Sequence, residues 1–373
     1  MLGEVIVDMD PEADALARGA RNLLEGCAQA TAGQSLLIVH EDTRLGYYGT
    51  GLVEAVTRVA EGICLDVRQM EVPFVANVDN VPSGLAAAIA DCDHALFLAR
   101  LGDQLRFRDL PQAGKCIVSY ALDRDALASP FGTAPHSAFA ELKRVFDAMF
   151  ASARGIRVTC PLGTDISGSL KASDSKTSSD ASIKRFPVSV FSPLDAGGFT
   201  GRVAVAHMLV GTGSRYYDPY GLALGSTLLA DISDSRIAAW DGDAADVARA
   251  KAHYRHVGDL FGIDRDCVHS WHAGIHPGCA YPRRADQNYE RWSGSAFGNP
   301  RLLHFHTCGA YAPGEICLNV VDPTIAVDGV DVWKGGRLDI DKVPGASSIL
   351  ARHPGVRSLF DNPSSFIGLG GNP

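Results

Sequence analysis

Short apolar runs alternate with amphipathic segments over the first 155 residues, and this alternation constrains the fold more than any other feature. The run SLLIVHED, which begins at Ser35, has the content of a buried strand, and TGLVEAVTRVAEG after it has the pattern of a helix. Extended and helical segments continue in turn as far as HSAFAELKRVFDAMFASA. Strands that alternate with helices of about 10–15 residues are typical of βαβ units. The sequence therefore predicts a doubly wound α/β domain over residues 1–155.

The character of the chain changes after residue 155. A Ser-, Lys- and Asp-rich stretch ends near Asp180 and indicates either a loop over a site or a linker. From about residue 186 short strands dominate, and one helical segment, DAADVARAKAHYRHVGDLFG, interrupts them. A chain of 373 residues also exceeds the usual size of one hydrophobic core. We therefore expect a second, strand-rich α+β domain over residues 156–373, and we expect it to carry the functional site.

The bulk composition argues against several classes of protein. The formal net charge is −9, and no Lys/Arg cluster supplies the basic surface that nucleic-acid binding needs. No apolar run approaches the about 20 residues that cross a bilayer, and the start MLGEVIVDMDPEADAL is acidic where a signal peptide is positive. Nine cysteines occur without a CxxC pair, so we expect reduced thiols. These features predict a cytoplasmic protein that binds neither nucleic acid nor membrane.

The first half of the chain offers no nucleotide-binding motif. The segment VHEDTRLGYYGTG after the first strand lacks a G-x-G-x-x-G pattern and a P-loop lysine, so we expect no nucleotide cofactor. Glu41, Asp42 and Arg44 follow this strand at the carboxyl end, where α/β sheets usually receive ligands. A solvated loop explains the same three residues equally simply.

Histidines concentrate in the second half, where seven of the twelve fall between residues 253 and 306. In RLLHFHTCG the two-residue period of a strand puts His304 and His306 on one face. In EICLNVV the same period puts Glu315, Cys317 and Asn319 on one face. If the two strands pair as a hairpin, His304, His306 and Glu315 can converge on one ion. Two imidazoles and a carboxylate suit a catalytic zinc or a non-haem ferrous site.

The segment SWHAGIHPGC adds His272 and His276 to the candidates. Gly274 and Pro277 indicate that this segment is a loop rather than a helix that presents two ligands four residues apart. We therefore expect only one of the two histidines to bind metal. For any single histidine of the set, a hydrogen-bonded structural role remains an alternative.

With these segments in order, the chain resembles the metallo-aminopeptidases of the thermophilic type and their relatives, the 2,5-dihydroxypyridine 5,6-dioxygenases. The resemblance covers most of the chain, and the order of the motifs carries it. The motifs are GIRVTCPLGTD at 155–165, FPVSVFSP at 186–193, HAGIHP at 272–277, HFHTCGAY at 304–311 and a terminal strand that ends in VDG at 327–329.

The resemblance implies roles for several residues and also has gaps. His272 coincides with a metal ligand, and the dioxygenase branch is similar in having histidine there. His304 matches a peptidase histidine, and Tyr311 matches the catalytic tyrosine of the peptidases. The segment at 186–190 lacks the acid that the peptidases have, and the final His-x-Asp pair of both branches falls on Cys317 and Asn319. Either Glu315 and His306 replace the lost ligands, or the site has decayed; we favour replacement.

These observations together predict a mononuclear metalloenzyme that oxidises a small polar or heteroaromatic molecule, with one divalent ion, first of all iron(II). His272, His304 and Glu315 are the expected ligands, and His306 is a fourth ligand or a base beside the metal. Tyr311 is expected to position the substrate or act as acid or base. The residues expected to bind the substrate are Arg283, Arg284 and His276, although solvated arginines are the simpler reading of the first two.

Two other classes of function remain open. One is a zinc- or manganese-dependent aminopeptidase or amidase with a rebuilt ligand set. The other is a non-catalytic binding protein with an incomplete metal site, which Cys317 and Asn319 favour. Because strand-rich domains offer edges for pairing, we also expect a homodimer or higher homo-oligomer.

Overall fold

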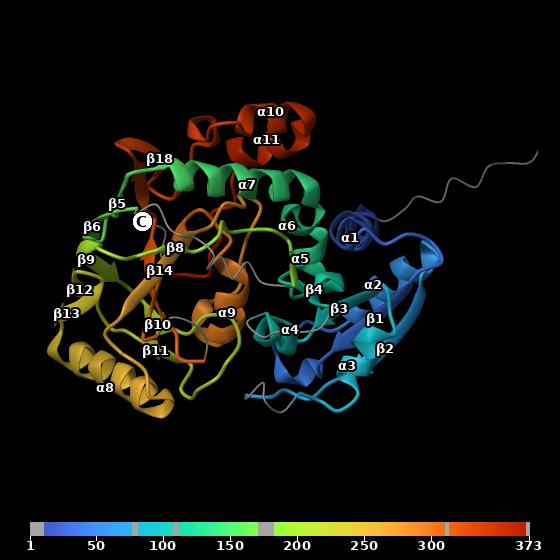
Figure 1. The fold of residues 1–373 in the computed structure, drawn as a ribbon, viewed down its shortest axis with the longest axis horizontal. Helices are drawn as coiled ribbons and strands as arrows, with labels where there is room; N and C mark the ends of the chain where they lie inside the picture. Colours follow the sequence, from blue (N-terminus) through green and yellow to red (C-terminus); the bar gives the residue numbers. More distant parts are fainter. Residues whose placement is uncertain (1–10, 77–80, 107–111, 171–182, 310–312, 371–373) are drawn as a thin grey trace, which may run out of the picture.

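A parallel sheet forms one half of the molecule (Figure 1). The computed structural model describes residues 11–76, 81–106, 112–170, 183–309 and 313–370. Its parallel sheet has the strand order β2-β1-β3-β4-β7. The strands are β1 (Ser35–His40), β2 (Asp66–Glu71), β3 (His94–Leu98), β4 (Cys116–Ser119) and β7 (Lys184–Phe186). The α/β part of the predicted fold class is therefore confirmed.

Helices cover both faces of this sheet, as a doubly wound fold requires. Alternate residues of β1 enter different cores: Leu36 packs with residues of α1 and α2, whereas Leu37 packs with residues of α3 and α4. In α2 the apolar side chains Leu52, Val56 and Ala60 recur every four residues and form the buried stripe. The helices of this half are α1 (Pro11–Arg21), which continues as a π-helix (Asn22–Ala28), α2 (Leu52–Gly62), α3 (Leu85–Ala90), α4 (Arg100–Leu105), α5 (Arg124–Ala128), α6 (Pro130–Thr133) and α7 (His136–Ser152).

Two antiparallel sheets form the other half, which is strand-rich as predicted. The six-stranded sheet has the order β11-β10-β16-β15-β14-β8, and the eight-stranded sheet has the order β13-β12-β9-β6-β5-β17-β18-β19. The strands of the six-stranded sheet are β8 (Leu194–Asp195), β10 (Met208–Val210), β11 (Gly221–Ala223), β14 (Val268–Ala273), β15 (Leu302–Thr307) and β16 (Ile316–Val321). Those of the eight-stranded sheet are β5 (Gly155–Thr159), β6 (Asp165–Ser169), β9 (Thr200–Val205), β12 (Leu228–Ser233), β13 (Arg236–Asp241), β17 (Thr324–Val327), β18 (Val330–Lys334) and β19 (Arg337–Leu338).

One shared core joins the two antiparallel sheets. Trp271, Phe305 and Leu318 of the six-stranded sheet pack with Val158 and Val203 of the eight-stranded sheet. The predicted helix at 243–262 is α8 (Ala244–Phe261), and the remaining helices are α9 (Tyr289–Ala296), α10 (Ala346–Arg352) and α11 (Pro354–Asp361). Because one face of β14, β15 and β16 is used for this core, the opposite face is left for other side chains.

Two features of the fold differ from the sequence reading or go beyond it. The prediction that the segment around His272 is a loop is wrong, because this residue lies in strand β14. The strand alternates Trp271 and Ala273 toward the core with His272 on the other face, and Gly274 comes only after its end. The division into domains at residue 155 stays a prediction, and β7, which lies beyond residue 155, completes the parallel sheet.

The described helices were also compared with the length of a bilayer. Within the described ranges, no helix combines the length and the apolar character that a membrane crossing needs.

Candidate metal centre

The six-stranded sheet brings the sequence-predicted histidines together. β14, β15 and β16 are neighbours, and their register aligns His272 with His304 and His304 with Asn319. His306 lies two residues along β15, opposite Cys317. Paired residues of an antiparallel sheet point to the same face, so all these side chains lie on the face that does not join the shared core. The hairpin predicted between β15 and β16 is confirmed.

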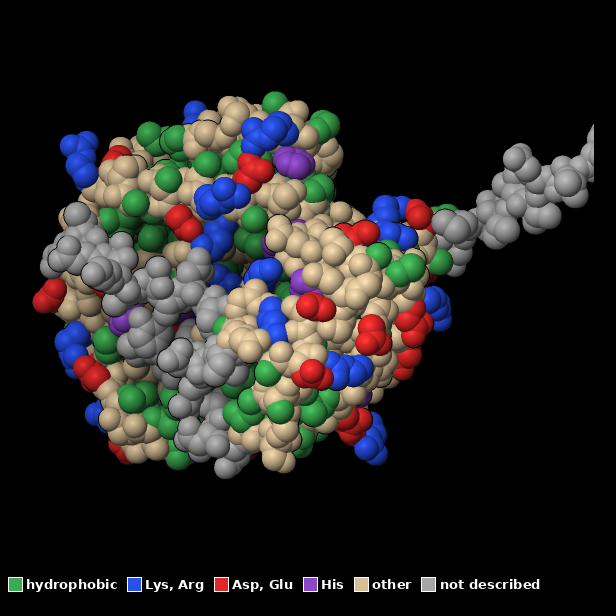
Figure 2. Space-filling model, turned by 45° about the vertical axis from the view of Figure 1, so that its right-hand side comes forward, with side chains coloured by type: hydrophobic (Ala, Val, Ile, Leu, Met, Phe, Trp, Pro, Cys, Tyr) green, Lys and Arg blue, Asp and Glu red, His purple; other side chains and the backbone are tan. Residues whose placement is uncertain are grey.

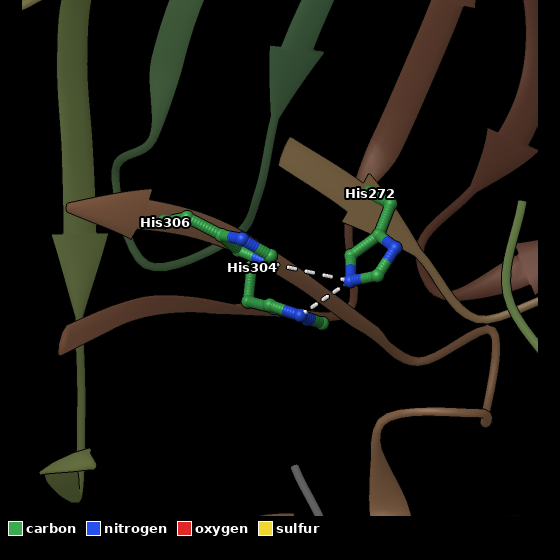
Figure 3. Close-up of side chains that lie close together, drawn as sticks. All are labelled: His272, His304 and His306. Atoms are coloured by element: carbon green, nitrogen blue, oxygen red, sulfur yellow. Dashed lines mark hydrogen bonds between the residues drawn. The ribbon is translucent and has the colours of Figure 1, made fainter. Parts of the chain in front are cut away.

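The ring nitrogens of three histidines converge. The distance from His272 Nε2 to His304 Nε2 is 2.7 Å, and the distance from His306 Nε2 to His272 Nε2 is 3.3 Å. Figure 3 shows this nitrogen of His272 between the two histidines of β15. One ligand atom from each residue lies within 4.8 Å of the others, and this is the group that can hold a metal among the described residues.

The hydrogen-bond partners of Nδ1, the ring nitrogen that points away from the centre and is called the outer nitrogen below, determine how two of these rings are protonated. His272 Nδ1 donates to the backbone carbonyl of Phe191 at 3.2 Å, and His306 Nδ1 donates to the Glu315 carboxylate at 3.0 Å. Each neutral imidazole carries one proton, so Nε2 of both rings presents a lone pair to the centre. Histidines that bind metals are held in this way by a carbonyl or carboxylate behind the ring.

Burial favours the neutral form of His272 and His304, which metal binding requires. His272, His304 and His306 are 7%, 2% and 9% exposed. Burial, together with the neighbouring imidazoles, holds the pKa values of His272 and His304 well below the ordinary value of histidine. The ring of Phe297 stacks on His304 with centroids 4.1 Å apart and closes one side of the cluster.

Glu315 lies behind His306 rather than beside the other ligand atoms. It immediately precedes β16, and its carboxylate accepts hydrogen bonds from His306 Nδ1 and from the hydroxyl of Thr212. Its backbone carbonyl accepts from Tyr217 at 2.8 Å. The expected ligand set of His272, His304 and Glu315 therefore does not converge; His306 takes the place given to Glu315, because the turn before β16 holds this carboxylate at the outer nitrogen of His306.

The residues predicted to bind substrate lie elsewhere. His276 is fully buried, stacks on Phe139 with centroids 3.8 Å apart and meets the edge of Phe131. Burial lowers the pKa of His276 to about 3. Arg283 pairs with Asp123 at 3.3 Å, and Arg284 pairs with Asp286 at the surface. Tyr311 lies outside the described residues.

Of the residues at the carboxyl end of β1, Glu41 belongs to a buried ion-pair cluster. Glu41 is buried and pairs with Arg100 at 3.1 Å, and Arg100 pairs with Glu290 at 2.9 Å. The side chain of Asp42 accepts a hydrogen bond from the backbone amide of Arg44 and caps a short turn at the surface. Glu41 therefore helps to connect the parallel sheet to α9.

A second polar network near the cluster was not predicted. Arg106 donates to the hydroxyl of Tyr120 at 2.7 Å, and Tyr120 donates to Asp103. The amide of Ser214 donates to the same aspartate at 3.3 Å, while Thr212 of the same loop reaches Glu315. No local sequence pattern marks these contacts, because the loop that carries Thr212 and Ser214 lies more than one hundred residues from Asp103 and from Glu315 along the chain. Figure 2 shows Lys and Arg side chains gathered around a hollow on one face of the molecule.

Comparison with known proteins supports the fold. No family model and no curated protein matches the chain. It is similar in structure to a 2,5-dihydroxypyridine dioxygenase from Pseudomonas putida KT2440, with a TM-score of 0.56 and 12% identity over 91% of this chain and 99% of the other. It also matches AmpT from Thermus thermophilus, with a TM-score of 0.48 and 10% identity over 88% and 99%. The first likeness establishes a distant relationship of fold.

Proposed function

We propose that this chain is a mononuclear metalloenzyme in which His272, His304 and His306 hold one divalent metal ion. The convergence of their three Nε2 atoms carries the proposal. The Nε2 atoms of His272 and His306 both present lone pairs, so only His304 can donate a proton to His272, and the close contact between His272 and His306 has no proton between its nitrogens. A metal ion at the centre satisfies all three nitrogens at once.

Iron(II) is the first candidate for the ion, and oxidation of a small molecule is the first candidate for the reaction. Imidazole ligands suit iron as well as zinc and copper, and three ligands leave positions open for a substrate and dioxygen. The similar fold from Pseudomonas putida belongs to a dioxygenase. Bound iron(II) would supply the activation of dioxygen, and the chain would supply a water-poor site for a small polar or heteroaromatic substrate.

The residues around the metal have separate proposed tasks. Glu315 holds the proton on His306 Nδ1 and so keeps Nε2 available to the metal. Phe297 packs against His304 and excludes water from that side. Tyr311 remains a candidate for substrate positioning. A cytoplasmic location and a homodimer or higher homo-oligomer belong to the same proposal.

A zinc-dependent hydrolase is the second candidate, and the donor set favours it. Three neutral histidines with one open position are also the ligands of a catalytic zinc that activates water. A zinc- or manganese-dependent amidase or aminopeptidase would therefore use the same three residues. In this case Glu315 would still orient His306.

Elemental analysis of protein purified without chelator tests the proposal. About one metal ion per chain is expected, and the variants His272→Ala, His304→Ala and His306→Ala should each lose it. Oxygen consumption that depends on iron, with hydroxylated N-heterocycles as substrates, would support oxidation, whereas amide cleavage with zinc or manganese would support hydrolysis. A parent chain that binds no metal after anaerobic reconstitution with iron or zinc would leave a non-catalytic binding protein.

A further inference from the structure

Asn319 is a buried carboxamide beside the metal cluster. It is 2% exposed, and its register places it directly opposite His304. Neither its Oδ1 nor its Nδ2 has a hydrogen-bond partner among the described residues. A buried polar group without a partner costs about 1–3 kcal/mol. The position therefore carries a cost that an apolar side chain would avoid.

The surroundings of Asn319 give it no structural task. On the same face of β16, two residues away on either side, are Cys317 and Val321, and both belong to an apolar cluster with Leu302 and Val210. Leucine has the same number and branching of side-chain heavy atoms as asparagine and, being apolar, suits such a cluster better. The presence of an amide here points to a partner that the metal-free cluster does not engage.

His304 is the histidine whose outer nitrogen needs a partner. The Nδ1 atoms of His272 and His306 have acceptors, whereas His304 Nδ1 is buried without one among the described residues. The two nitrogens of one imidazole point in widely different directions. Because His304 Nε2 faces His272 on β14, its Nδ1 faces away from β14, toward the side on which β16 carries Asn319.

Proton counting connects the two unpaired groups. In the metal-free cluster His272 Nε2 is an acceptor, so the proton of His304 lies on Nε2 and is donated to His272, which leaves Nδ1 without a proton. When Nε2 binds a metal, the single proton of the neutral ring must lie on Nδ1. A buried Nδ1–H then requires an acceptor.

We propose that Asn319 is the positioning residue of His304 and that its Oδ1 accepts the Nδ1 proton when the metal is bound. The inference rests on the proposed metal site. Paired residues of an antiparallel sheet have Cβ atoms about 4.5–5.5 Å apart, so rotation of the Asn319 side chain suffices to form the bond. Every metal-binding histidine then has its own acceptor: a carbonyl for His272, a carboxylate for His306 and an amide for His304.

The variant Asn319→Leu separates this role from a merely structural one. It removes a buried unpaired amide, so the melting temperature of the metal-free protein should stay the same or rise. Metal affinity, measured by competition with a chelator for zinc or cobalt(II), should fall about 10–100-fold, as for other groups that orient metal ligands. Asn319→Asp keeps an acceptor oxygen and should retain most of the affinity.

Asn299→Leu is the matched control. Asn299 is equally buried, but its amide donates to the carbonyls of Cys279 and Ser364. Its replacement should lower the melting temperature and leave metal affinity unchanged. Unchanged affinity in Asn319→Leu would overturn the proposal, whereas a parent chain without metal affinity would overturn the metal site itself.

A second measurement does not depend on the folding of any variant. In zinc-loaded parent protein with ¹⁵N-labelled histidine, NMR should find His304 protonated at Nδ1 and bound to metal through Nε2. Binding of the metal through Nδ1 would overturn the role of Asn319.

Discussion

Two of the buried polar clusters among the described residues are built in opposite ways. In the first, the guanidinium of Arg100 binds the carboxylates of Glu41 and Glu290 and stacks over the ring of Phe74. In the second, the imidazoles of His272, His304 and His306 point their Nε2 atoms toward one another. The first cluster joins opposite charges from two halves of the chain, whereas the second joins three imidazole nitrogens, two of which present lone pairs to the centre.

The difference supports separate roles for the two clusters: stabilisation of the fold for the first and the proposed metal binding for the second. In the Arg100 cluster a cation of the chain pairs with the carboxylates of Glu41 and Glu290, so the cluster connects the parallel sheet to α9. Nitrogen atoms that face one another need a cation between them to be satisfied together. A similar degree of burial therefore accompanies a structural role in one cluster and a proposed binding role in the other, and variants can separate the two roles.

The largest expected effect concerns the metal. Structural zinc sites with four ligands gain about 10–16 kcal/mol, which corresponds to roughly 3–4 kcal/mol for each ligand. Any one of His272→Ala, His304→Ala and His306→Ala should therefore weaken metal binding by roughly a hundredfold to a thousandfold in a chelator competition assay. The metal-free variants should remain folded by circular dichroism. The exposed His256→Ala serves as control and should bind metal like the parent, and a His304→Ala protein with full affinity would contradict the assignment.

Next in size is the removal of Arg100. Arg100→Met leaves two buried carboxylates without a cation, which should lower the free energy of unfolding by about 3–5 kcal/mol. Urea unfolding monitored by fluorescence measures this change. Adding Glu41→Gln and Glu290→Gln to the same chain removes the unpaired charges and should restore much of the stability. If Arg100→Met were as stable as the parent but bound less metal, the two clusters would not have the separate roles given to them here.

Glu315 tests the boundary of the second cluster. Glu315→Gln keeps an oxygen that can accept from His306 Nδ1 but removes the negative charge, so metal affinity should fall about 10-fold. The loss should be in affinity and not in stoichiometry, which titration calorimetry distinguishes. Thr212→Val removes one hydrogen bond to the same carboxylate and should have a smaller effect. A complete loss of metal in Glu315→Gln would instead make Glu315 a direct ligand.

The last effect is small near neutral pH, and it concerns a buried histidine that belongs to neither cluster. Burial lowers the pKa of His276 to about 3, below the value of about 6.5 in the unfolded chain. Below pH 6.5 the unfolded state binds more protons, so this histidine removes up to about 1.4 kcal/mol of stability for each pH unit of acidification. His276→Gln does not titrate and should show a shallower loss between pH 6.5 and pH 4 in urea unfolding. An identical slope in the variant would mean that His276 titrates with the same pKa in the folded and unfolded states.

Local patterns were sufficient for the elements and for the faces of the strands. The two-residue period of β15 separated Phe305 from His304 and His306 correctly, because a pleated strand points successive side chains to opposite faces. The four-residue spacing in α2 and the apolar content of β1 were equally informative. By contrast, Gly274 and Pro277 do not indicate a loop at His272, because they follow the strand that carries this residue and do not interrupt it.

The sequence by itself therefore determined the mixed α/β character, the hairpin of β15 and β16, and the short set of histidines from which ligands can come. Only the tertiary structure decided that His306 rather than Glu315 joins His272 and His304, and that His276 is enclosed between Phe131 and Phe139. The physical reason is the distance along the chain over which each property is determined. Side-chain period is set by neighbouring backbone geometry, whereas the convergence of ring nitrogens depends on sheet register and on partners such as Phe191 and Thr212, which lie about eighty to one hundred residues away along the chain.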